Sequence, residues 1–250
     1  MGNDFWKNTQ MSNAQMNMAN HSKYIEISER EHENSLRINI LSSELSNKIK
    51  DLCPQARVGL DIGCQTGQIT ERIYSNTGIS FYCIEPDPNC VVHASKKIKA
   101  LQGVASNLPF EDSSFDIVTI ISVIEHIHPK DLLSSFYEIF RVLKPSGYCI
   151  GQIPNMNFPI EIHSRLPFQQ FLPRKIGDKY LATFSKIYKK SEWYRTDKKR
   201  ILRLAMKVGF KEITVIPFLY PKYVIPKKFQ PFYWIISVFP LDYIFWFRKP

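Results

Sequence analysis

A glycine loop and an acid placed one strand later are the residues best spaced to bind a ligand. Gly63 and Gly67 follow the apolar run Val58–Ile62 and precede a helical pattern. Glycine lets the backbone take positive φ and approach a ligand closely, and the N–H groups at a helix start favour a carboxylate or phosphate. Glu85 lies eighteen residues after Gly67, where a carboxylate can accept hydrogen bonds from ribose hydroxyls. This spacing therefore favours a cofactor that contains a nucleoside.

Two histidines are candidate general bases, because imidazole titrates near neutral pH. His126 follows the strand-like run Ile117–Ile121, and His163 lies in a later segment rich in proline and aromatic residues. We expect both beyond the carboxyl ends of the strands, where open α/β sheets bind ligands. Two other roles stay open: Glu125-His126 could cap the next helix and close the cofactor pocket, and His163 could contact the substrate.

Short apolar runs alternate with amphipathic stretches, which predicts a parallel sheet with helices on both faces. The strand-like runs are Val58–Ile62, Ser80–Ile84, Ile117–Ile121, Tyr148–Ile153, Lys211–Pro217 and Tyr243–Phe247. The helical stretches are Tyr24–Leu52, Gly67–Ser75, Pro88–Lys99, Lys130–Leu143 and Asp197–Val208, and a turn is expected at Lys144–Gly147.

The alternation is interrupted at about residues 154–196 and 218–242, which we interpret as substrate or lid insertions. We therefore expect a polar leader and an N-terminal helix over residues 1–53 and one α/β domain over residues 54–250. Five cysteines without CxxC spacing favour reduced thiols over a metal cluster or a disulfide scaffold. The first twenty residues lack an apolar core of the secretory type, so we expect a cytoplasmic protein.

The net charge of +10 is unevenly distributed: residues 1–164 carry 14 Lys and Arg against 18 Asp and Glu, and residues 165–250 carry 19 against 5. The basic part also contains twelve aromatic residues between positions 218 and 247. Aromatics interleaved with lysines favour contact with an anionic membrane surface, at the inner face of the membrane, or with a lipid-like acceptor. The same aromatics could instead cover the sheet edge or form a dimer contact. Apolar neighbours make stacked nucleic-acid bases a poorer alternative.

Four blocks of the sequence resemble the class I S-adenosylmethionine-dependent methyltransferases, in particular the small-molecule branch known as type 11. They are LDIGCQTG, CIEPDP, NLPFEDSSFDIVTIISVIEHI and RVLKPSGYCIGQIPN, and they occur in the family's order and spacing. The resemblance implies a Rossmann-like, doubly wound, mostly parallel seven-stranded sheet with an N-terminal helical extension and C-terminal insertions. It also implies S-adenosylmethionine as cofactor. Dinucleotide binding is less attractive, because it normally requires three glycines in this loop.

The resemblance assigns the cofactor-binding residues. Asp61, Gly63 and Gly67 would surround the methionyl part of the cofactor, and Glu85 would hold the ribose. Relatives usually place an acid near the adenine amino group, but Val104 stands at that position here. Adenine recognition would then rest on backbone groups or on Ser106. Ala105, Ser106 and Ile121 complete the expected cofactor-binding residues.

Two further implications concern Arg37 and metal ions. The segment His32–Arg37 looks like the N-terminal element of quinone-precursor methyltransferases, in which an arginine reaches the cofactor carboxylate; a surface arginine is the alternative. Some relatives hold a divalent metal through E-x-x-E-H, whereas this chain reads Ser122-Val-Ile-Glu125-His126. A hard cation would have too few oxygen ligands there, so we expect no required metal.

The expected function is methyl transfer, most simply to an oxygen of a small-molecule, glycan or lipid-linked acceptor. One alternative is a cofactor-fold protein without catalysis that acts as a binding partner. Another is an RNA or protein methyltransferase, although the N-P-P-Y-type tetrad typical of amino-group methylation is absent from the end of the fourth strand.

Overall fold

The computed structural model describes residues 36–96, 98–161, 163–164, 166–185, 188–221, 230–231 and 233–250, without the side chains of residues 235–237. The first twelve residues of the expected helix Tyr24–Leu52 lie outside this part of the chain. So do several residues of the aromatic segment, including Lys222, Tyr223 and Phe232.

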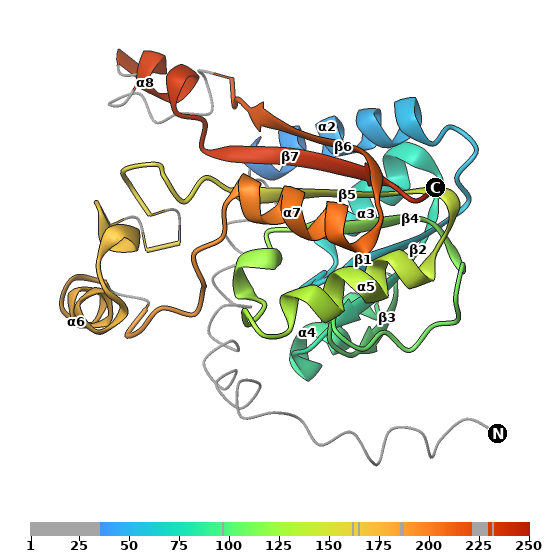
Figure 1. The fold of residues 1–250 in the computed structure, drawn as a ribbon, viewed down its shortest axis with the longest axis horizontal. Helices are drawn as coiled ribbons and strands as arrows, with labels where there is room; N and C mark the ends of the chain where they lie inside the picture. Colours follow the sequence, from blue (N-terminus) through green and yellow to red (C-terminus); the bar gives the residue numbers. More distant parts are fainter. Residues whose placement is uncertain are drawn as a thin grey trace.

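The described chain forms one seven-stranded sheet in the order β3-β2-β1-β4-β5-β7-β6 (Figure 1). The strands are β1 Val58–Ile62, β2 Ser80–Glu85, β3 Lys99–Gln102, β4 Phe115–Ile121, β5 Leu143–Pro154, β6 Lys211–Phe218 and β7 Asp242–Arg248. Neighbouring strands are parallel except that β7 runs antiparallel to both β5 and β6. The predicted doubly wound, mostly parallel sheet is confirmed.

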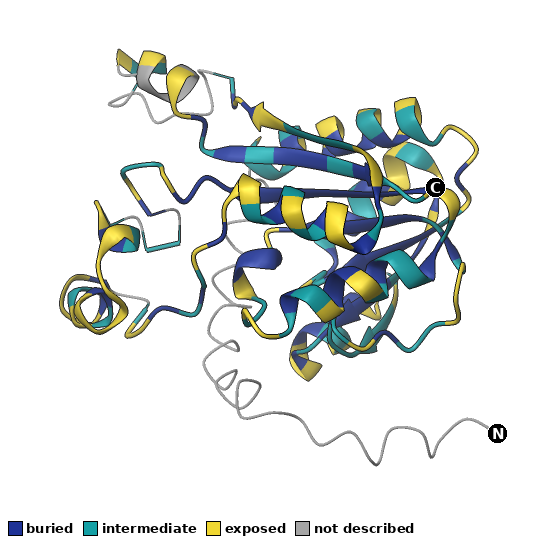
Figure 2. Cartoon of the chain, viewed as in Figure 1, coloured by how far each residue is buried: buried dark blue, intermediate teal, exposed yellow. Residues whose placement is uncertain are grey.

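Helices cover both faces of the sheet, because side chains alternate between faces along each strand. On one face, α2 (Leu36–Leu52) and α3 (Gln68–Thr77) pack on a buried cluster that includes Ile117 and Ile150. On the other face, α5 (Leu132–Val142) and α7 (Lys198–Val208) pack on a cluster that includes Val118 and Ile120. The short helix α4 (Pro88–Ala94) connects β2 to β3. The dark central strands of Figure 2 show how completely these layers bury the sheet.

The structure corrects two local expectations. The helix expected at Pro88–Lys99 ends at Ala94, and the edge strand β3 follows at Lys99–Gln102. The sequence Lys99-Ala-Leu-Gln102 is too short and too mixed to show a strand pattern. The turn expected at Lys144–Gly147 lies inside β5 as an irregularity, since the pairing jumps from Phe115 with Leu143 to Ile117 with Tyr148.

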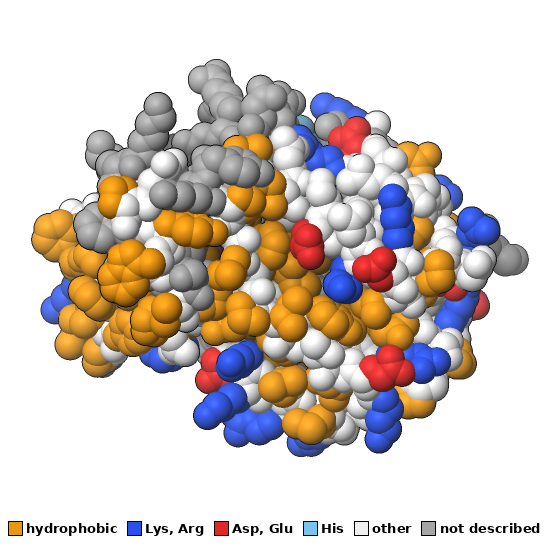
Figure 3. Space-filling view, turned by 90° about the horizontal axis from the view of Figure 1, so that it is seen from above, with side chains coloured by type: hydrophobic (Ala, Val, Ile, Leu, Met, Phe, Trp, Pro, Cys, Tyr) orange, Lys and Arg blue, Asp and Glu red, His pale blue; other side chains and the backbone are white. Residues whose placement is uncertain are grey.

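The first insertion lies beyond the carboxyl ends of the parallel strands, on the left of Figure 1. It contains the 3-10 turn η4 (Gln169–Phe171) and helix α6 (Arg174–Phe184), and a short helix α8 (Tyr233–Val238) precedes β7. Exposed apolar side chains gather on these segments; they are Phe168, Phe171, Leu172, Ile176, Phe184, Trp234, Val238 and Phe239. Figure 3 shows hydrophobic side chains concentrated on the side where Figure 1 draws α6 and α8. Within the described residues, no helix combines the length and apolar character needed to cross a bilayer.

Candidate functional site

The loop after β1 is built around two glycines in left-handed conformation. Gly63 has φ of 75° and Gly67, the residue that caps α3, has φ of 81°. A Cβ on Gly63 would come within 2.3 Å of a methyl carbon of Val123, and one on Gly67 within 2.7 Å of Ile98. Only glycine satisfies both the conformation and the available space. The loop therefore requires glycine at both positions, and contact of the N–H groups at the start of α3 with a ligand stays a prediction.

Asp61, the fourth residue of β1, is buried at the base of this loop. Its two carboxylate oxygens accept hydrogen bonds from the hydroxyls of Thr70 in α3 and Thr119 in β4, the latter at 2.7 Å. Burial raises the pKa of Asp61 to about 6, although both hydroxyl bonds oppose that change. Asp61 thus joins β1, β4 and α3, and its position favours an indirect role in shaping the loop.

Glu85 ends β2 and closes the other side of the loop. Its carboxylate accepts hydrogen bonds from the backbone N–H of Gln65 at 2.9 Å and of Asp87 at 3.1 Å. Because a carboxylate offers about four acceptor positions, these two bonds leave capacity for two hydroxyl donors. Burial raises the pKa of Glu85 to about 7. The site thus fits a ribose, whose two neighbouring hydroxyls would bond to the ionised form.

The residues predicted to contact adenine lie at the same edge of the sheet. Ala105 and Ser106 follow β3, in a short turn closed by pairing of Val104 with Asn107. Ala105 is buried in the cluster on the α5 face, whereas Ser106 is half-buried. Ile121 is the last residue of β4 and is buried on the α2 face. Their position at the carboxyl edge agrees with the assignment, which stays a prediction.

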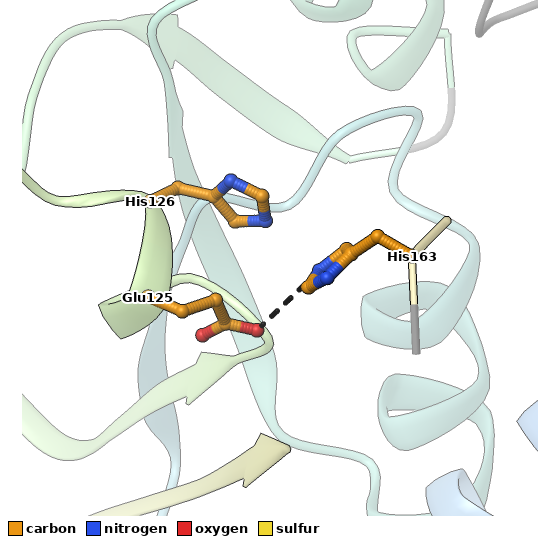
Figure 4. A group of neighbouring side chains, drawn as sticks. All are labelled: Glu125, His126 and His163. Carbon is orange, nitrogen blue, oxygen red and sulfur yellow. Dashed lines mark ion pairs between the residues drawn. The ribbon is translucent and has the colours of Figure 1, made fainter. Parts of the chain in front are cut away.

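The two candidate bases, distant in sequence, meet at the ends of β4 and β5 (Figure 4). His126 ends the 3-10 turn η3 (Ile124–His126), and His163 lies in the first insertion; their ring centroids are 5.2 Å apart. The Nδ1 atom of His163 is 2.6 Å from a carboxylate oxygen of Glu161, and its ring stacks on Trp193. The Nδ1 atom of His126 is 3.1 Å from the carbonyl oxygen of Glu192. The insertion therefore fixes the orientation of both imidazoles.

Glu125 lies beneath the two histidines and is 1% exposed. Neither of its carboxylate oxygens has a hydrogen-bond partner among the described residues, and the nearer one is 4.0 Å from Nε2 of His163. Burial raises the pKa of Glu125 to about 7, although a charge on His163 would oppose the shift. The backbone carbonyl of Glu125 accepts a hydrogen bond from Tyr194 N–H, which ties η3 to the insertion.

Arg37 at the start of α2 reaches the same edge, but through partners that we did not predict. Its guanidinium donates to Asp242 Oδ2 at 2.8 Å and to the Tyr220 hydroxyl at 3.0 Å. Burial disfavours the charged form, yet the carboxylate of Asp242 and the bond to Tyr220 raise the pKa of Arg37. Asp242 is fully buried at the start of β7, so this ion pair fixes α2 to the C-terminal strand. A direct bond from Arg37 to the cofactor remains a prediction.

Sequence reasoning missed several residues of the site. The role of Thr119 could have been predicted, because it is the polar residue in the otherwise apolar run Ile117–Ile121. Glu161 also left a signal, since it stands two residues before His163. No local sequence pattern indicates Trp193 or Gln152, because their roles depend on how the insertion and the end of β5 fold. Gln152 is buried and accepts a hydrogen bond from the Ser122 hydroxyl, at the point where β4 ends.

Comparison with known proteins adds independent evidence on this arrangement. Residues 60–151 match the family model described as "Methyltransferase domain". The chain is 34% identical over 166 residues to a demethylmenaquinone methyltransferase of Lactococcus lactis subsp. lactis (strain IL1403), covering 60% of this chain and 64% of that protein. It is 36% identical over 103 residues to the sterol 24-C-methyltransferase erg6 of Schizosaccharomyces pombe (strain 972 / ATCC 24843), covering 38% of this chain and 26% of that one.

Among solved structures, the fold resembles a SAM-dependent methyltransferase of Thermotoga maritima, described as a possible histamine N-methyltransferase. The TM-score is 0.60 at 20% identity, over 93% of this chain and 100% of that one. The chain spans less than two thirds of the length of either sequence relative given above.

Proposed function

We propose that the chain is a class I S-adenosylmethionine-dependent methyltransferase and that it transfers a methyl group to an apolar small molecule with an acidic hydroxyl. The observation that supports this proposal best is the His126–His163 pair at the carboxyl edge of the sheet, beside the cofactor loop. Small-molecule acceptors with apolar scaffolds are also named for the relatives from Lactococcus lactis and Schizosaccharomyces pombe.

The residues of the loop fit S-adenosylmethionine. Glu85 would accept hydrogen bonds from both ribose hydroxyls, and the glycines would let the backbone approach the methionyl part. Asp61 acts through Thr70 and Thr119 by holding the loop in place. Ala105, Ser106 and Ile121 would surround the adenine. When bound, the cofactor supplies a methyl carbon that its sulfonium activates toward nucleophiles.

The histidine pair would remove the proton from the acceptor. The carboxylate of Glu161 accepts from Nδ1–H of His163, which leaves the lone pair of a neutral imidazole on Nε2. Despite burial, the bond from His163 lowers the pKa of Glu161, so this acid is ionised at neutral pH. The acceptor proton would move to Nε2 of His163, and the acceptor oxygen would then take the methyl group that the bound cofactor supplies. His126 would position the hydroxyl beside it.

We favour oxygen as the atom methylated, because the base would act on a hydroxyl. Methylation of a carbon atom is the alternative, because the name of the Schizosaccharomyces pombe relative, sterol 24-C-methyltransferase, specifies a carbon as the atom methylated. Removing the proton of a phenol or an enol also makes the adjacent carbon nucleophilic, so both outcomes need the same base. An amine acceptor would need the base less, since a neutral amine is itself a nucleophile.

The exposed apolar side chains beside the site suggest how an apolar acceptor is delivered. Phe168 and Phe184 in the first insertion, and Trp234 near β7, are each at least 60% exposed. Residues 165–250 carry a net charge of +14. We propose that these segments contact an anionic lipid surface in which the acceptor dissolves.

The function is tested with the full chain and S-adenosylmethionine labelled in the methyl group. Incubation with a cell extract, followed by separation into lipid, glycan, RNA and protein fractions, is expected to place the label in the lipid fraction. Label in RNA or protein would contradict the proposed acceptor. Calorimetric binding of the cofactor without label in any fraction would favour the non-catalytic alternative. Hydrolysis and mass spectrometry of the product then distinguish a methyl group on oxygen from one on carbon.

A further inference from the structure

Three potential metal ligands converge on one point from two separate parts of the chain. Glu125 and His126 come from η3, and His163 comes from the insertion thirty-seven residues later. One ligand atom from each lies within 4.8 Å of the others. In tetrahedral zinc, ligand atoms with bonds of about 2.0–2.2 Å are about 3.3–3.6 Å apart, so two atoms at 4.8 Å would each have to move by roughly 0.7 Å to close this site. Figure 4 shows both rings and the carboxylate directed toward the space between them.

The outer hydrogen bonds of both histidines match those of metal ligands. A histidine that binds a metal through one nitrogen normally donates its other ring N–H to a carboxylate or a backbone carbonyl. Here Nδ1 of His163 faces Glu161, and Nδ1 of His126 faces the carbonyl of Glu192. A backbone carbonyl can only accept a hydrogen bond, and a carboxylate accepts one from an imidazole N–H. In both neutral rings the lone pair is therefore on Nε2, the nitrogen on the side of the cluster.

Glu125 provides a second, independent observation. Its carboxylate is buried, and neither oxygen has a hydrogen-bond partner among the described residues. An ionised carboxylate in such surroundings is costly unless a cation compensates it. Among the described residues, the ionic neighbour of Glu125 is His163, whose Nε2 atom lies 4.0 Å from the carboxylate. A cation between the carboxylate and the two imidazoles would therefore compensate a buried acid.

We propose that Glu125, His126 and His163 bind one divalent transition-metal ion of the zinc or cobalt type. Two imidazole nitrogens and one carboxylate form a donor set that suits such ions and leaves coordination positions open. This set does not suit Mg²⁺ or Ca²⁺, which agrees with the expectation from the sequence that a hard cation would lack oxygen ligands. What that expectation did not include is His163, which only the fold brings to the cluster.

The ion would change how the acceptor is activated. The ion would occupy the Nε2 lone pair that takes the proton in the metal-free site. An acceptor hydroxyl in an open position would then lose its proton to solvent water more readily, because the ion polarises the oxygen. His163 would thus act as a base when the site holds no metal ion and as a ligand when it holds one. This consequence rests on the proposed function, whereas binding of the ion does not.

The test is a Co²⁺ titration of the full chain without a histidine tag, followed by visible absorption and then by Zn²⁺ competition. We expect one Co²⁺ per chain, with absorption that Zn²⁺ abolishes. His163→Ala and Glu125→Gln should each weaken binding by more than about 100-fold, and Glu161→Gln by about 10–100-fold as an outer-shell change. His128→Ala, which removes a half-buried histidine two residues after His126, should leave the titration unchanged. S-adenosylmethionine affinity, measured in parallel, shows that each variant is folded.

Two results would overturn the site: no saturable one-to-one binding, or equal Co²⁺ affinity in the wild-type chain and in folded His163→Ala and Glu125→Gln. Either result leaves methyl transfer by the metal-free enzyme intact. Stoichiometric Co²⁺ binding without transfer of the labelled methyl group to any acceptor would support the metal site and contradict the proposed methyl transfer.

Discussion

The two halves of the sheet's carboxyl edge are assembled in different ways. On the cofactor side, Gly63, Gly67 and Glu85 lie within one β-α-β unit, and the local sequence places each of them. On the acceptor side, His126 and His163 belong to segments that contact each other only because the insertion folds back on η3 through Tyr194 and Glu192. Substitutions on the first side should therefore weaken cofactor binding, and substitutions on the second side should lower turnover without weakening it.

The largest effect is expected for Gly63→Val. The new Cβ would overlap the side chain of Val123, and the backbone would keep a φ of 75° that β-branched residues avoid. Overpacking and left-handed strain together should lower the free energy of unfolding by about 2–5 kcal/mol and abolish cofactor binding. Urea unfolding and calorimetry measure the two effects.

Gly78→Val is the matched control. Gly78 has a similar φ of 73°, but a Cβ there meets no atom within 4 Å among the described residues. It should cost only the strain of about 1–2 kcal/mol and leave cofactor affinity unchanged. If the two variants behave alike, the contact with Val123 is not what requires glycine at position 63.

On the acceptor side, His163→Ala should keep cofactor affinity and lower turnover by about 10²–10⁴-fold, the range typical of a lost general base. His126→Ala should reduce turnover less, because the carboxylate partner lies on His163. His128→Ala controls for loss of an imidazole near the site. Steady-state rates and calorimetry on the same preparations separate the roles. A parallel loss of cofactor affinity in His163→Ala would indicate a structural role.

The sequence predicted the two halves to different extents, because one half depends on neighbouring residues and the other on residues far apart in the chain. The cofactor half depends on short-range features: the conformation that glycine allows, and an acid at the end of the next strand. These are visible in Val58–Gly67 and at Glu85. The acceptor half depends on pairs separated by tens of residues, such as His126 with the carbonyl of Glu192, and no local pattern specifies them.

The same contrast explains the errors in the fold. Strands β1, β2 and β4 were predicted nearly to their ends because buried parallel strands are continuous apolar runs. Strand β3 lies at the sheet edge, is only four residues long, and has no fully buried side chain, so its sequence resembled the end of the preceding helix. Tertiary pairing with β2 decides its conformation.

A smaller effect on the cofactor side is expected for Glu85. Glu85→Ala should weaken S-adenosylmethionine binding by about 1–3 kcal/mol, the scale of charge-assisted hydrogen bonds. Burial raises the pKa of Glu85 to about 7, so the free protein largely holds this proton at pH 6. The ionised form accepts the ribose hydroxyls, so binding releases the proton. Affinity should therefore fall by up to about tenfold per pH unit below pH 7.

Glu85→Gln tests that assignment, because it keeps the shape and removes the titration. Its affinity should be lower and nearly constant between pH 6.5 and pH 8, a window above the pKa of about 6 of Asp61. For the stability of the free protein the sign is opposite. An unfolded glutamate titrates near pH 4.3, so the native state binds the extra proton between about pH 4.3 and 7, and stability falls as pH rises through this window. An unchanged pH slope in Glu85→Gln would move the titrating group elsewhere.

The smallest effect is expected for the exposed apolar segments. Aromatic side chains such as Trp234 and Phe239 would enter a lipid surface, and each nearby lysine would add on the order of 1 kcal/mol on an anionic membrane. Co-sedimentation with vesicles containing phosphatidylserine should therefore be strong at low salt and weaker at high salt, where charges beyond about 8–10 Å are screened.

Changing Trp234 and Phe239 together to Ser should reduce binding to these vesicles several-fold. The control is Tyr74→Ser with Val92→Ser, which removes two side chains of similar exposure from α3 and α4. If the two double variants sediment alike, the exposed aromatics do not bind the vesicles. If the wild-type chain stays in the supernatant with every lipid mixture, the segment is a lid, core or dimer surface and the membrane hypothesis is wrong.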